Sequence, residues 1–436
     1  MNLAPLLLTR AAEGRPVRAG LIGTGKFGSM FLNQVPTVPG LEVPVIADLS
    51  PDRARTAMEH VGWSALDIDG VTILDNGADL CAHPDVDVVI DATGHPEAGI
   101  LHARAAIRHG KHIVMVNVEA DVLAGPLLAA EAREAGVVYS MAYGDQPALT
   151  AELVDWARAC GFGVVAAGKG TKYLDGFNQS TPDTVWDHYG LTPESAAADG
   201  LNPQMFNSFL DGTKSAIEMA AIANACDLSA PSDGLSFPPC GVDDLPHVLR
   251  PRDEGGMLEA KGMVEVISSV ERDGRPVFKD LRWGVYVVVE APNAYAMNCF
   301  SQYGMVTDSS GRYSALYRPT HMIGLELNIS VLNAALRGEA TGAPRAFNAD
   351  VMATAKRDLD AGEVLDGEGG YTVFGKVAPA AKALSTGALP LGLASGVTLK
   401  HPIAAGAVVR WSDVEINEAF PAVQARRAME QRFGRS

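Results

Sequence analysis

The chain has 436 residues, of which 47% are hydrophobic and 20% are charged, and this length and composition indicate a globular protein of two or three domains. Its 35 Lys and Arg face 52 Asp and Glu, so the formal net charge is −17, and such an acidic surface argues against nucleic acid and anionic membranes as partners. An anionic small molecule is not excluded, because a local cluster of Lys and Arg can still form a positive pocket.

The five cysteines are scattered and never spaced C-x-x-C. This disfavours a zinc site or a disulfide framework and predicts a reducing, cytoplasmic compartment. The first residues, MNLAPLLLTRAAEG, have no basic residue ahead of their apolar run, so we expect a short helix packed on the first domain rather than a signal peptide. No stretch approaches the ~20 apolar residues of a membrane-spanning helix.

Residues 1–150 alternate short apolar strands with helices, a pattern that predicts an α/β domain with a parallel, doubly wound sheet of the Rossmann type. The first strand runs into a glycine-rich turn, and a helix is expected over 27–35. The expected strands lie within residues 17–28, 42–50, 86–93, 111–118 and 136–144.

The glycine-rich turn carries G-x-G-x-x-G, directly after a strand and at the start of a helix. The first glycine permits the tight turn, the second lets the backbone approach a pyrophosphate, and the third lets helix and strand pack closely. The free N–H groups of the helix N-terminus then face the phosphates. The residues predicted to bind a dinucleotide here are Gly23, Thr24, Gly25, Lys26, Phe27 and Gly28.

An acidic residue, Asp48, ends the second expected strand. It could bind both ribose hydroxyls of NAD and repel the 2′-phosphate of NADP, whereas Arg53, with Arg55 nearby, could hold that phosphate. The pattern leans toward NAD and leaves NADP open. Residues after later strands are expected beside the ribose and nicotinamide, although each could equally be an ordinary turn residue. They are Thr93, Gly94 and Asn117.

Residues 151–345 predict an α+β catalytic and dimerisation domain. Long alternating strands, GMVEVISSVER and LRWGVYVVVEAP, indicate an antiparallel sheet with one covered face. A Pro- and Gly-rich stretch over 227–260 is expected to be a long ordered loop, and 320–338 an apolar helix. Residues 346–436 predict a small β-rich module.

The stretch MFNSFLDGTKSAIEMAAIANAC, beginning at Met205, resembles a buried helix with a charged end. At about 100° per residue, Asn207, Asp211, Lys214 and Glu218 fall in one stripe. Burying unpaired charge is costly, so the stripe must meet water, partners or a ligand. It is either a solvent face with a Lys214–Glu218 pair, in which Asp211 caps the helix, or a chemical site.

Other cationic and aromatic residues gather on expected loops, in GKGTKY and in GRYSALYRPTH. Several Lys and Arg near a helix start suit a carboxylate or phosphate, although surface loops of mixed charge read the same way. A lysine can polarise a carbonyl as hydride arrives, and a carboxylate can relay the proton. The candidate catalytic residues are Lys214, Asp211 and Lys169, and the candidate substrate-binding residues are Lys172, Asn207, Glu218, Arg312, Tyr317, Arg318 and His321.

Residues 1–150 and the FLDGTKSAIEMAAIANA stretch resemble homoserine dehydrogenase, whose catalytic helix carries an Asp and a Lys. The resemblance gives those roles to Asp211 and Lys214. Where homoserine dehydrogenases show Asn-Lys after the GKHIV strand, this chain has Asn117 and then Val118, which disfavours homoserine itself as the substrate.

The region 350–416 resembles a SAF domain. Together with NVEADV, GKGTKY, NPQMFNSFLDGTK and FPPCGVDDLPHVLRPRD, it makes nearly the whole chain similar to the second type of deoxyxylulose 5-phosphate reductoisomerase-like proteins. That resemblance implies a homodimer that uses NADPH to isomerise and reduce the sugar phosphate to methylerythritol 4-phosphate, an isoprenoid step.

Two other functions stay open at this point. One is a plain NAD(P)-dependent dehydrogenase of a small hydroxy acid, amino alcohol or polyol derivative, and the other is a nucleotide-sensing or scaffolding protein. If a hydroxyketone rearranges before reduction, Mg²⁺ or Mn²⁺ would suit Glu218, Asp211 or Glu290. No spaced ligand motif exists, so no metal residue is assigned.

Overall fold

The computed structural model describes residues 2–198 and 200–434. These residues form two compact units, which are described separately below. The first comprises Met1–Ala151, His321–Arg345 and Gln424–Arg432, and the second comprises the remaining segments, chiefly Glu152–Thr320 and Ala346–Val423. The division into domains at residues 1–150, 151–345 and 346–436 stays a prediction.

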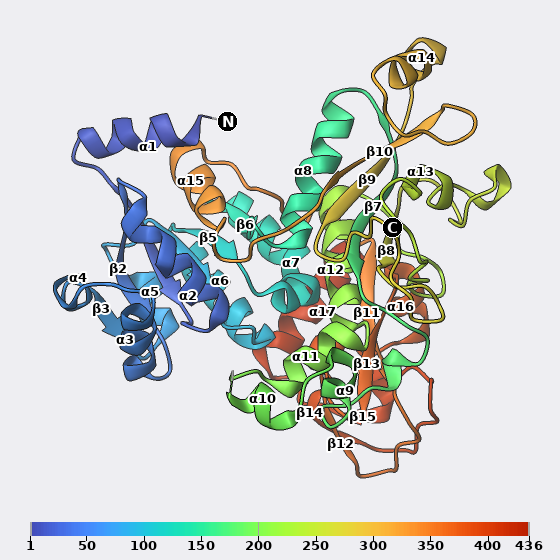
Figure 1. Cartoon of the computed structure of the whole chain (residues 1–436). Helices are drawn as coiled ribbons and strands as arrows, with labels where there is room; N and C mark the ends of the chain where they lie inside the picture. The colour runs from blue at the N-terminus through green and yellow to red at the C-terminus, as the bar shows by residue number, and fades with distance from the viewer. Residues whose placement is uncertain (1, 199, 435–436) are drawn as a thin grey trace. The chain divides into compact units, whose positions relative to one another are not determined.

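The first unit contains a parallel six-stranded sheet in the order β3-β2-β1-β4-β5-β6 (Figure 1). The prediction of a Rossmann-type parallel sheet is therefore confirmed. The central strands are almost wholly apolar and buried, as expected of a sheet covered on both faces. The strands are β1 Val17–Ile22, β2 Leu41–Ala47, β3 Thr72–Leu74, β4 Val88–Asp91, β5 His112–Met115 and β6 Tyr139–Met141.

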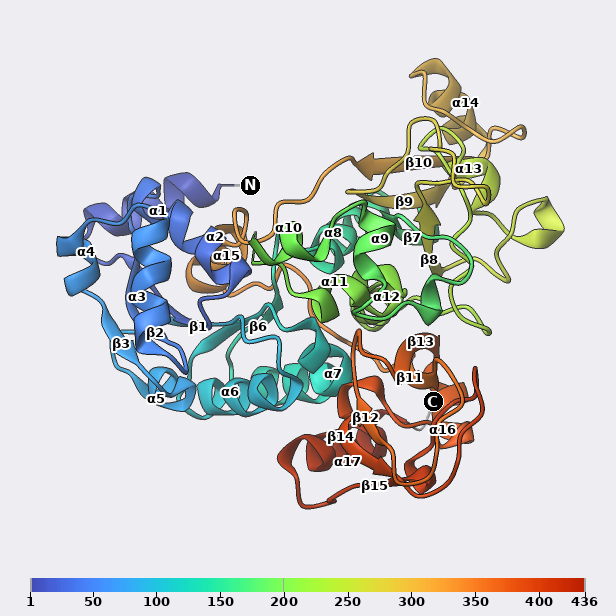
Figure 2. The same cartoon turned by 60° about the horizontal axis from the view of Figure 1, so that its bottom comes forward.

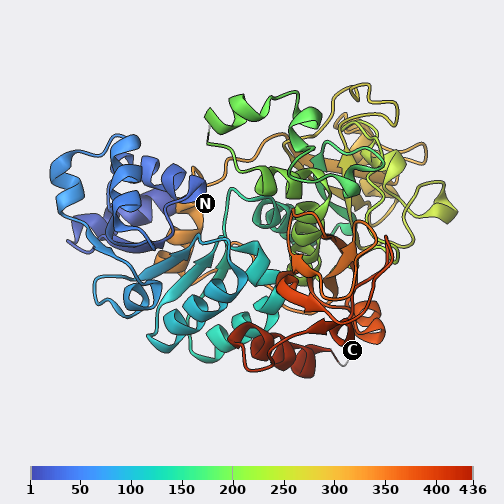
Figure 3. The ribbon, with the colours of Figure 1, turned by 90° about the horizontal axis from the view of Figure 1, so that it is seen from below.

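Helices flank this sheet, as the blue and teal segments of Figure 3 show. The N-terminal residues form the predicted short helix, which buries Leu3 and Leu7 in the core of the unit. The helices are α1 Leu3–Ala12, α2 Lys26–Gln34, α3 Pro51–His60, α4 Ala65–Asp69, α5 Gly77–Ala82, α6 Pro96–Arg108, α7 Val118–Glu134 and α15 Asn328–Arg337. Only the last part of the apolar run predicted as a helix over 320–338 is α-helical.

The second unit contains a four-stranded sheet in the order β10-β9-β7-β8. The β10–β9 and β9–β7 pairs are antiparallel, but β7 and β8 are parallel, so the expectation of a wholly antiparallel sheet is wrong. A long helical crossover between β7 and β8 permits the parallel pairing, because no tight turn has to join them. The strands are β7 Gly163–Thr171, β8 Met263–Ser268, β9 Val285–Glu290 and β10 Tyr313–Arg318.

The stretch from Met205 to Cys226 forms two helices instead of the single one expected. The chain turns at Asp211 and Gly212, and Gly212 has a φ of 86°, which favours glycine. The Pro-rich segment 227–260 is a loop interrupted by the short helix Leu245–Val248 and a 3-10 turn at Arg252–Glu254. The helices of this part are α8 Gln146–Ala159, α9 Val185–Tyr189, α10 Pro193–Ala198, α11 Pro203–Leu210, α12 Thr213–Cys226, α13 Leu245–Val248 and α14 Ala294–Gln302.

The C-terminal segment is β-rich, as predicted. Strands β11 and β13 form an antiparallel pair, and β12, β14 and β15 form a second small sheet. Helix α12 packs on β11 and β13, which lie beside it in Figures 1 and 2. The elements are β11 Ala349–Ala355, β12 Val364–Asp366, β13 Val373–Pro379, α16 Ala380–Thr386, β14 Ser395–Leu399, β15 Val414–Glu415 and α17 Pro421–Phe433.

Candidate functional site

The glycine-rich turn after β1 has the geometry that a bound pyrophosphate requires. Gly23 has a φ of 94°, and a Cβ on Gly28 would collide with the Gly23 carbonyl. A Cβ on Gly25 would meet nothing within 4 Å, so the backbone there is open to a ligand. No side chain caps the N-terminus of α2, and its N–H groups are therefore available to phosphate oxygens. The turn fits the phosphates of a dinucleotide.

The other predicted residues of this turn have distinct places. Lys26 is exposed at the first position of α2, while Phe27 is half-buried and packs against the core. Thr24 is buried and donates to Asp48 Oδ2 from its backbone N at 2.9 Å and from Oγ1 at 2.6 Å. The turn is thus fastened to the end of β2.

Asp48 is buried, and its second oxygen is also engaged. Oδ1 accepts from the Ser50 N–H at 3.0 Å and from Arg53 Nη2 at 2.5 Å. Burial raises the pKa of Asp48, but the hydrogen bonds from Thr24, Ser50 and Arg53 outweigh it and hold the pKa below its usual value. Arg53 has 60% of its side chain exposed. The Arg53 guanidinium is therefore paired with the Asp48 carboxylate, which was expected to bind the ribose hydroxyls.

The residues predicted near the nicotinamide form a polar cluster after β4. Thr93 Oγ1 donates to Asp91 Oδ1 at 2.8 Å, and Asn117 Nδ2 donates to the His95 carbonyl at 2.8 Å. Asn117 also caps α7 by accepting from the Ala120 N–H. Gly94 has a φ of 66°. The structure brings Thr93 and Asn117 together at the carboxyl edge of the parallel sheet, the edge where such sheets bind ligands.

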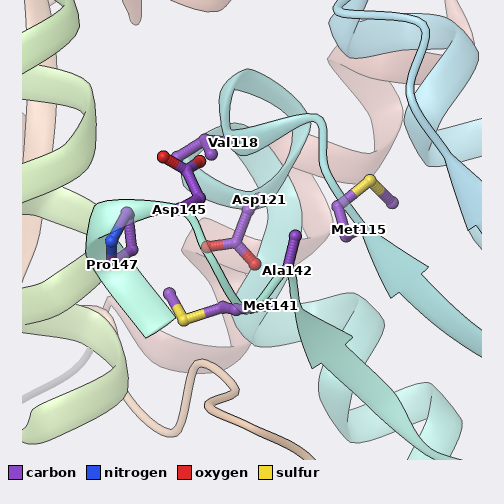
Figure 4. A pocket seen from close by; sticks show the side chains of 7 residues that line it. All are labelled: Met115, Val118, Asp121, Met141, Ala142, Asp145 and Pro147. Carbon is purple, nitrogen blue, oxygen red and sulfur yellow. The ribbon is translucent and has the colours of Figure 1, made fainter. Parts of the chain in front are cut away.

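A small pocket lies near this edge, with an acidic side chain in its wall (Figure 4). Asp121 Oδ1 accepts from the Tyr139 hydroxyl at 2.8 Å, while Oδ2 has no hydrogen-bond partner. Burial raises the pKa of Asp121 to about 7, against a smaller lowering by Tyr139. The lining residues are Met115, Val118, Asp121, Met141, Ala142, Asp145 and Pro147.

The raised pKa of Asp121 predicts a specific pH dependence of stability. Above an unfolded-state pKa of about 4 the unfolded chain ionises first, so stability falls as pH rises and levels off near pH 7. Between pH 5 and pH 8 the wild type should lose about 3 kcal/mol relative to Asp121→Asn, from about 1.4 kcal/mol per pH unit. Unfolding followed across this range checks the difference.

Tyr139→Phe is the matched variant for this test. It removes the hydrogen bond that lowers the pKa of Asp121, so the decline in stability should extend to higher pH. If the free energies of unfolding of the wild type and Asp121→Asn change in parallel with pH, the pKa of Asp121 is not raised by burial.

In the second unit, Lys169 of β7 and Glu218 of α12 form a buried ion pair. Their side chains are only 8% and 5% exposed. Lys214 lies one helical turn before Glu218, in the first turn of α12, and is half-buried. The structure therefore gathers Lys169, Lys214 and Glu218 of the predicted site, and Lys169 forms an ion pair with the carboxylate.

Asp211 and Asn207 belong to a different cluster from the one expected. Lys356 Nζ lies 2.8 Å from Asp211 Oδ2, and both side chains are buried. Burial raises the pKa of Asp211, and Lys356 opposes that shift. Asn207 is fully buried, and its Nδ2 donates to the carbonyls of Ser180 and Gly369 at 3.0 and 2.9 Å. The prediction that these four residues form one stripe on a single helix is wrong. The turn at Gly212 separates Asn207 and Asp211 from Lys214 and Glu218.

Lys356 was missed by the sequence reasoning. It follows the apolar strand β11 in the phrase ATAKRDL, and a lone lysine after a buried strand was the available signal. Its partner lies far away in the sequence, so no spacing pattern could reveal the pair.

The predicted arginines lie at opposite ends of β10. Arg318 pairs across the sheet with Val285, which in turn pairs with Lys169. Residues in one such row point to the same face, and two strand spacings place the backbones of Lys169 and Arg318 about 10 Å apart. Arg312 stands about 20 Å from Arg318 along the strand and forms ion pairs with Glu254 and Glu290. A single anion site that uses both arginines is therefore wrong.

The remaining predicted residues are spread out. Lys172 Nζ donates to the His188 carbonyl at 2.7 Å, and burial, with the charge of Arg282, lowers the pKa of Lys172. Tyr317 is 46% exposed on β10. His321 is half-buried in the segment of the first unit that precedes α15.

Within residues 2–198 and 200–434, no group of three or more His, Cys, Asp or Glu side chains is arranged to hold a metal ion. Glu290, one of the acids considered for a divalent cation, pairs with Lys261 at 2.9 Å and with Arg312. In the same described residues, no helix is long and apolar enough to cross a membrane.

Three family models match parts of the chain. Residues 23–141 match the homoserine dehydrogenase NAD-binding domain, residues 144–327 match the catalytic domain of oxidoreductase DRL, and residues 351–415 match the SAF domain. With the turn geometry above, these matches define the class: the chain is an NAD(P)-dependent oxidoreductase with an α/β fold and a C-terminal SAF domain.

Among curated proteins, glycosyl hydrolase family 109 protein 3 of Phocaeicola vulgatus is 29% identical over 106 residues, which is 24% of this chain and 19% of that protein. Protein 1 of the same family from Bacteroides thetaiotaomicron is 31% identical over 104 residues, which is 23% of this chain and 21% of that protein. The chain thus spans about a fifth of the length of these relatives.

Solved structures are similar over larger parts at low identity. A 3-ketoreductase from Actinomadura kijaniata in complex with NADP and TDP-benzene is 22% identical, with a TM-score of 0.26 over 36% of this chain and 48% of that chain. A myo-inositol dehydrogenase from Lactobacillus casei in complex with NAD(H) and myo-inositol is 16% identical, with a TM-score of 0.35 over 63% of this chain and 71% of that chain.

The expected resemblance to deoxyxylulose 5-phosphate reductoisomerase is wrong. The catalytic segment matches the catalytic domain of oxidoreductase DRL instead. The homoserine dehydrogenase NAD-binding domain is the part of the expectation that remains. Isomerisation of the sugar phosphate and a place in isoprenoid synthesis have no support.

Proposed function

We propose that the chain is a dehydrogenase or reductase of a small, sugar-like polyol or hydroxy acid, of the Gfo/Idh/MocA type and without isomerisation. The observation that carries this proposal is the buried Lys169–Glu218 pair with Lys214 one turn away. In the oxidation direction the C–H hydride passes to the nicotinamide, the hydroxyl proton passes to a basic group, and a carbonyl forms. Lys214 would contact the reacting oxygen, and Lys169 with Glu218 would carry the proton.

The row of residues across the sheet that contains Lys169 also offers a charge partner for the substrate. Arg318 points to the same sheet face and is half-buried. A guanidinium there suits a carboxylate or phosphate on the substrate. We therefore favour an anionic polyol derivative, such as a sugar acid or a sugar phosphate.

Turnover assays test this function directly. The pure protein is offered NADP⁺ or NAD⁺ with polyols, hydroxy acids and their phosphates, and NADPH or NADH with the matching ketones, with and without Mg²⁺ or Mn²⁺. Turnover is expected with at least one polyol or ketone, and its product should keep the carbon skeleton of the substrate. A rearranged skeleton, or no turnover with any compound, would refute the proposal.

We propose NADP(H) as the preferred cofactor. Arg53 neutralises the Asp48 carboxylate, and its largely exposed guanidinium would bind the 2′-phosphate. Arg53→Ala should raise the Kd of NADPH about tenfold, equivalent to about 1.4 kcal/mol, and change the Kd of NADH less than twofold. Arg55→Ala is the matched control, because Arg55 on the same helix pairs with exposed Asp69 at 3.2 Å. If Arg53→Ala raises the Kd of NADPH and of NADH equally, Arg53 does not bind the 2′-phosphate.

We also keep the prediction of a cytoplasmic homodimer. The edge strand β10 with its exposed Tyr317 supports an interface through this sheet. Light scattering should then give about twice the chain mass of 45.8 kDa.

A further inference from the structure

A buried polar network surrounds the turn between α11 and α12. Asp211 accepts from the Thr213 N–H at 2.8 Å, and Thr213 is the first residue of α12. The carboxylate thereby fixes where α12 begins, one residue before Lys214. The turn itself contains Gly212, whose backbone is otherwise free to adopt several conformations.

The SAF domain supplies the other half of this network. Lys356 Nζ contacts Asp211 Oδ2 at 2.8 Å and donates to the carbonyls of Ser180 and Gly370, each at 2.7 Å. Two donors of the ammonium group thus go to backbone carbonyls, and its charge is paired with the Asp211 carboxylate. The Lys356 side chain is 2% exposed and that of Asp211 is 0% exposed, so neither charge has water as an alternative partner.

Two further contacts join the SAF domain to the same turn. The Gly375 N–H donates to Thr213 Oγ1 at 2.8 Å, and the Gly369 carbonyl accepts from Asn207. On its other side, Gly212 lies against the rings of Tyr173 and Phe237, which are stacked at 3.8 Å. The turn is therefore held from the SAF domain and from the catalytic segment at once.

We propose that the SAF domain belongs to the catalytic apparatus, with Lys356 as a positioning residue that holds Asp211 and so orients the first turn of α12 and Lys214. This inference rests on the proposed function for its effect on turnover. It also gives Asp211 a role different from proton relay, because its carboxylate is enclosed by Lys356 and Thr213. Removing either charge would leave the other buried and unpaired, which is strongly destabilising.

The test compares Lys356→Met, Lys356→Met/Asp211→Asn and Lys376→Met in the full chain. Lys376 is the matched control, since it lies in the SAF domain and pairs with exposed Asp233 at 3.0 Å. Hydrogen exchange of peptides covering 205–216 reports the turn, and the Kd of NADPH reports the integrity of the nucleotide unit. Steady-state assays then give kcat and KM.

Lys356→Met should speed exchange in 205–216 at least tenfold and lower kcat at least tenfold, with the Kd of NADPH changed less than twofold. The double variant should recover most of both losses, because an Asn at 211 still accepts from Thr213 and leaves no buried charge. Lys376→Met should match the wild type.

Unchanged exchange in 205–216 would overturn the proposal whatever the activity, and faster exchange with an unchanged kcat would overturn the link to catalysis. If the wild type turns over no substrate, the proposed function fails, and the exchange data alone decide whether Lys356 holds the turn.

Discussion

Lys214→Met should reduce kcat by about 10²–10³-fold and leave the Kd of NADP(H) within twofold of the wild type. The expected loss is that of a group that stabilises charge on the reacting oxygen. Lys214 is half-buried at the start of α12, with Glu218 one turn further on. Steady-state kinetics on the substrate found by the turnover assays and a separate cofactor titration measure the two quantities.

The control for this variant is Lys279→Met, which removes a lysine whose side chain is 52% exposed and pairs with Asp243 at 2.7 Å. Exposed ion pairs contribute little, so its kcat should be unchanged. Lys214→Arg keeps the charge and should recover part of the lost rate. If Lys214→Met and Lys279→Met behave alike, Lys214 does not contact the reacting oxygen.

The nucleotide-binding half of the protein could be predicted because its signals are local. The apolar runs that begin at residues 17 and 86 contain β1 and β4, and the glycine spacing correctly predicted the turn before α2. The short strand β3 was missed, since three residues, Thr72–Leu74, carry no periodicity. The sequence also could not show that Arg53 covers Asp48, because that depends on a side-chain conformation.

The candidate site in the second unit was harder to predict, because its partners are distant in sequence. The Asp-Gly pair at 211–212 is a common turn signal, and it would have split the helix correctly. Helical periodicity concealed this turn signal, because Asp211 and Lys214 have the spacing of residues on one face of a single helix. The pairs Lys169–Glu218 and Asp211–Lys356 join residues from different elements, and only the folded chain brings them together.

The Lys169–Glu218 pair leads to a prediction that separates stability from chemistry. Lys169→Met leaves Glu218 buried and uncompensated, which should cost about 3–5 kcal/mol of stability. In the double variant Lys169→Met/Glu218→Leu both charges are replaced by apolar side chains, so stability should return to within about 1 kcal/mol of the wild type. Denaturant unfolding measures both changes.

Activity should not follow stability in this series. If Lys169 and Glu218 carry the proton, the double variant will fold well and still turn over at least 10²-fold more slowly than the wild type. Lys261→Met, which breaks a pair with Glu290 that is only partly buried, should lose less than about 1 kcal/mol and keep its activity. A stable double variant with normal turnover would show that the buried pair only supports the fold. The reacting oxygen would then have to rely on Lys214 without a proton carrier from β7.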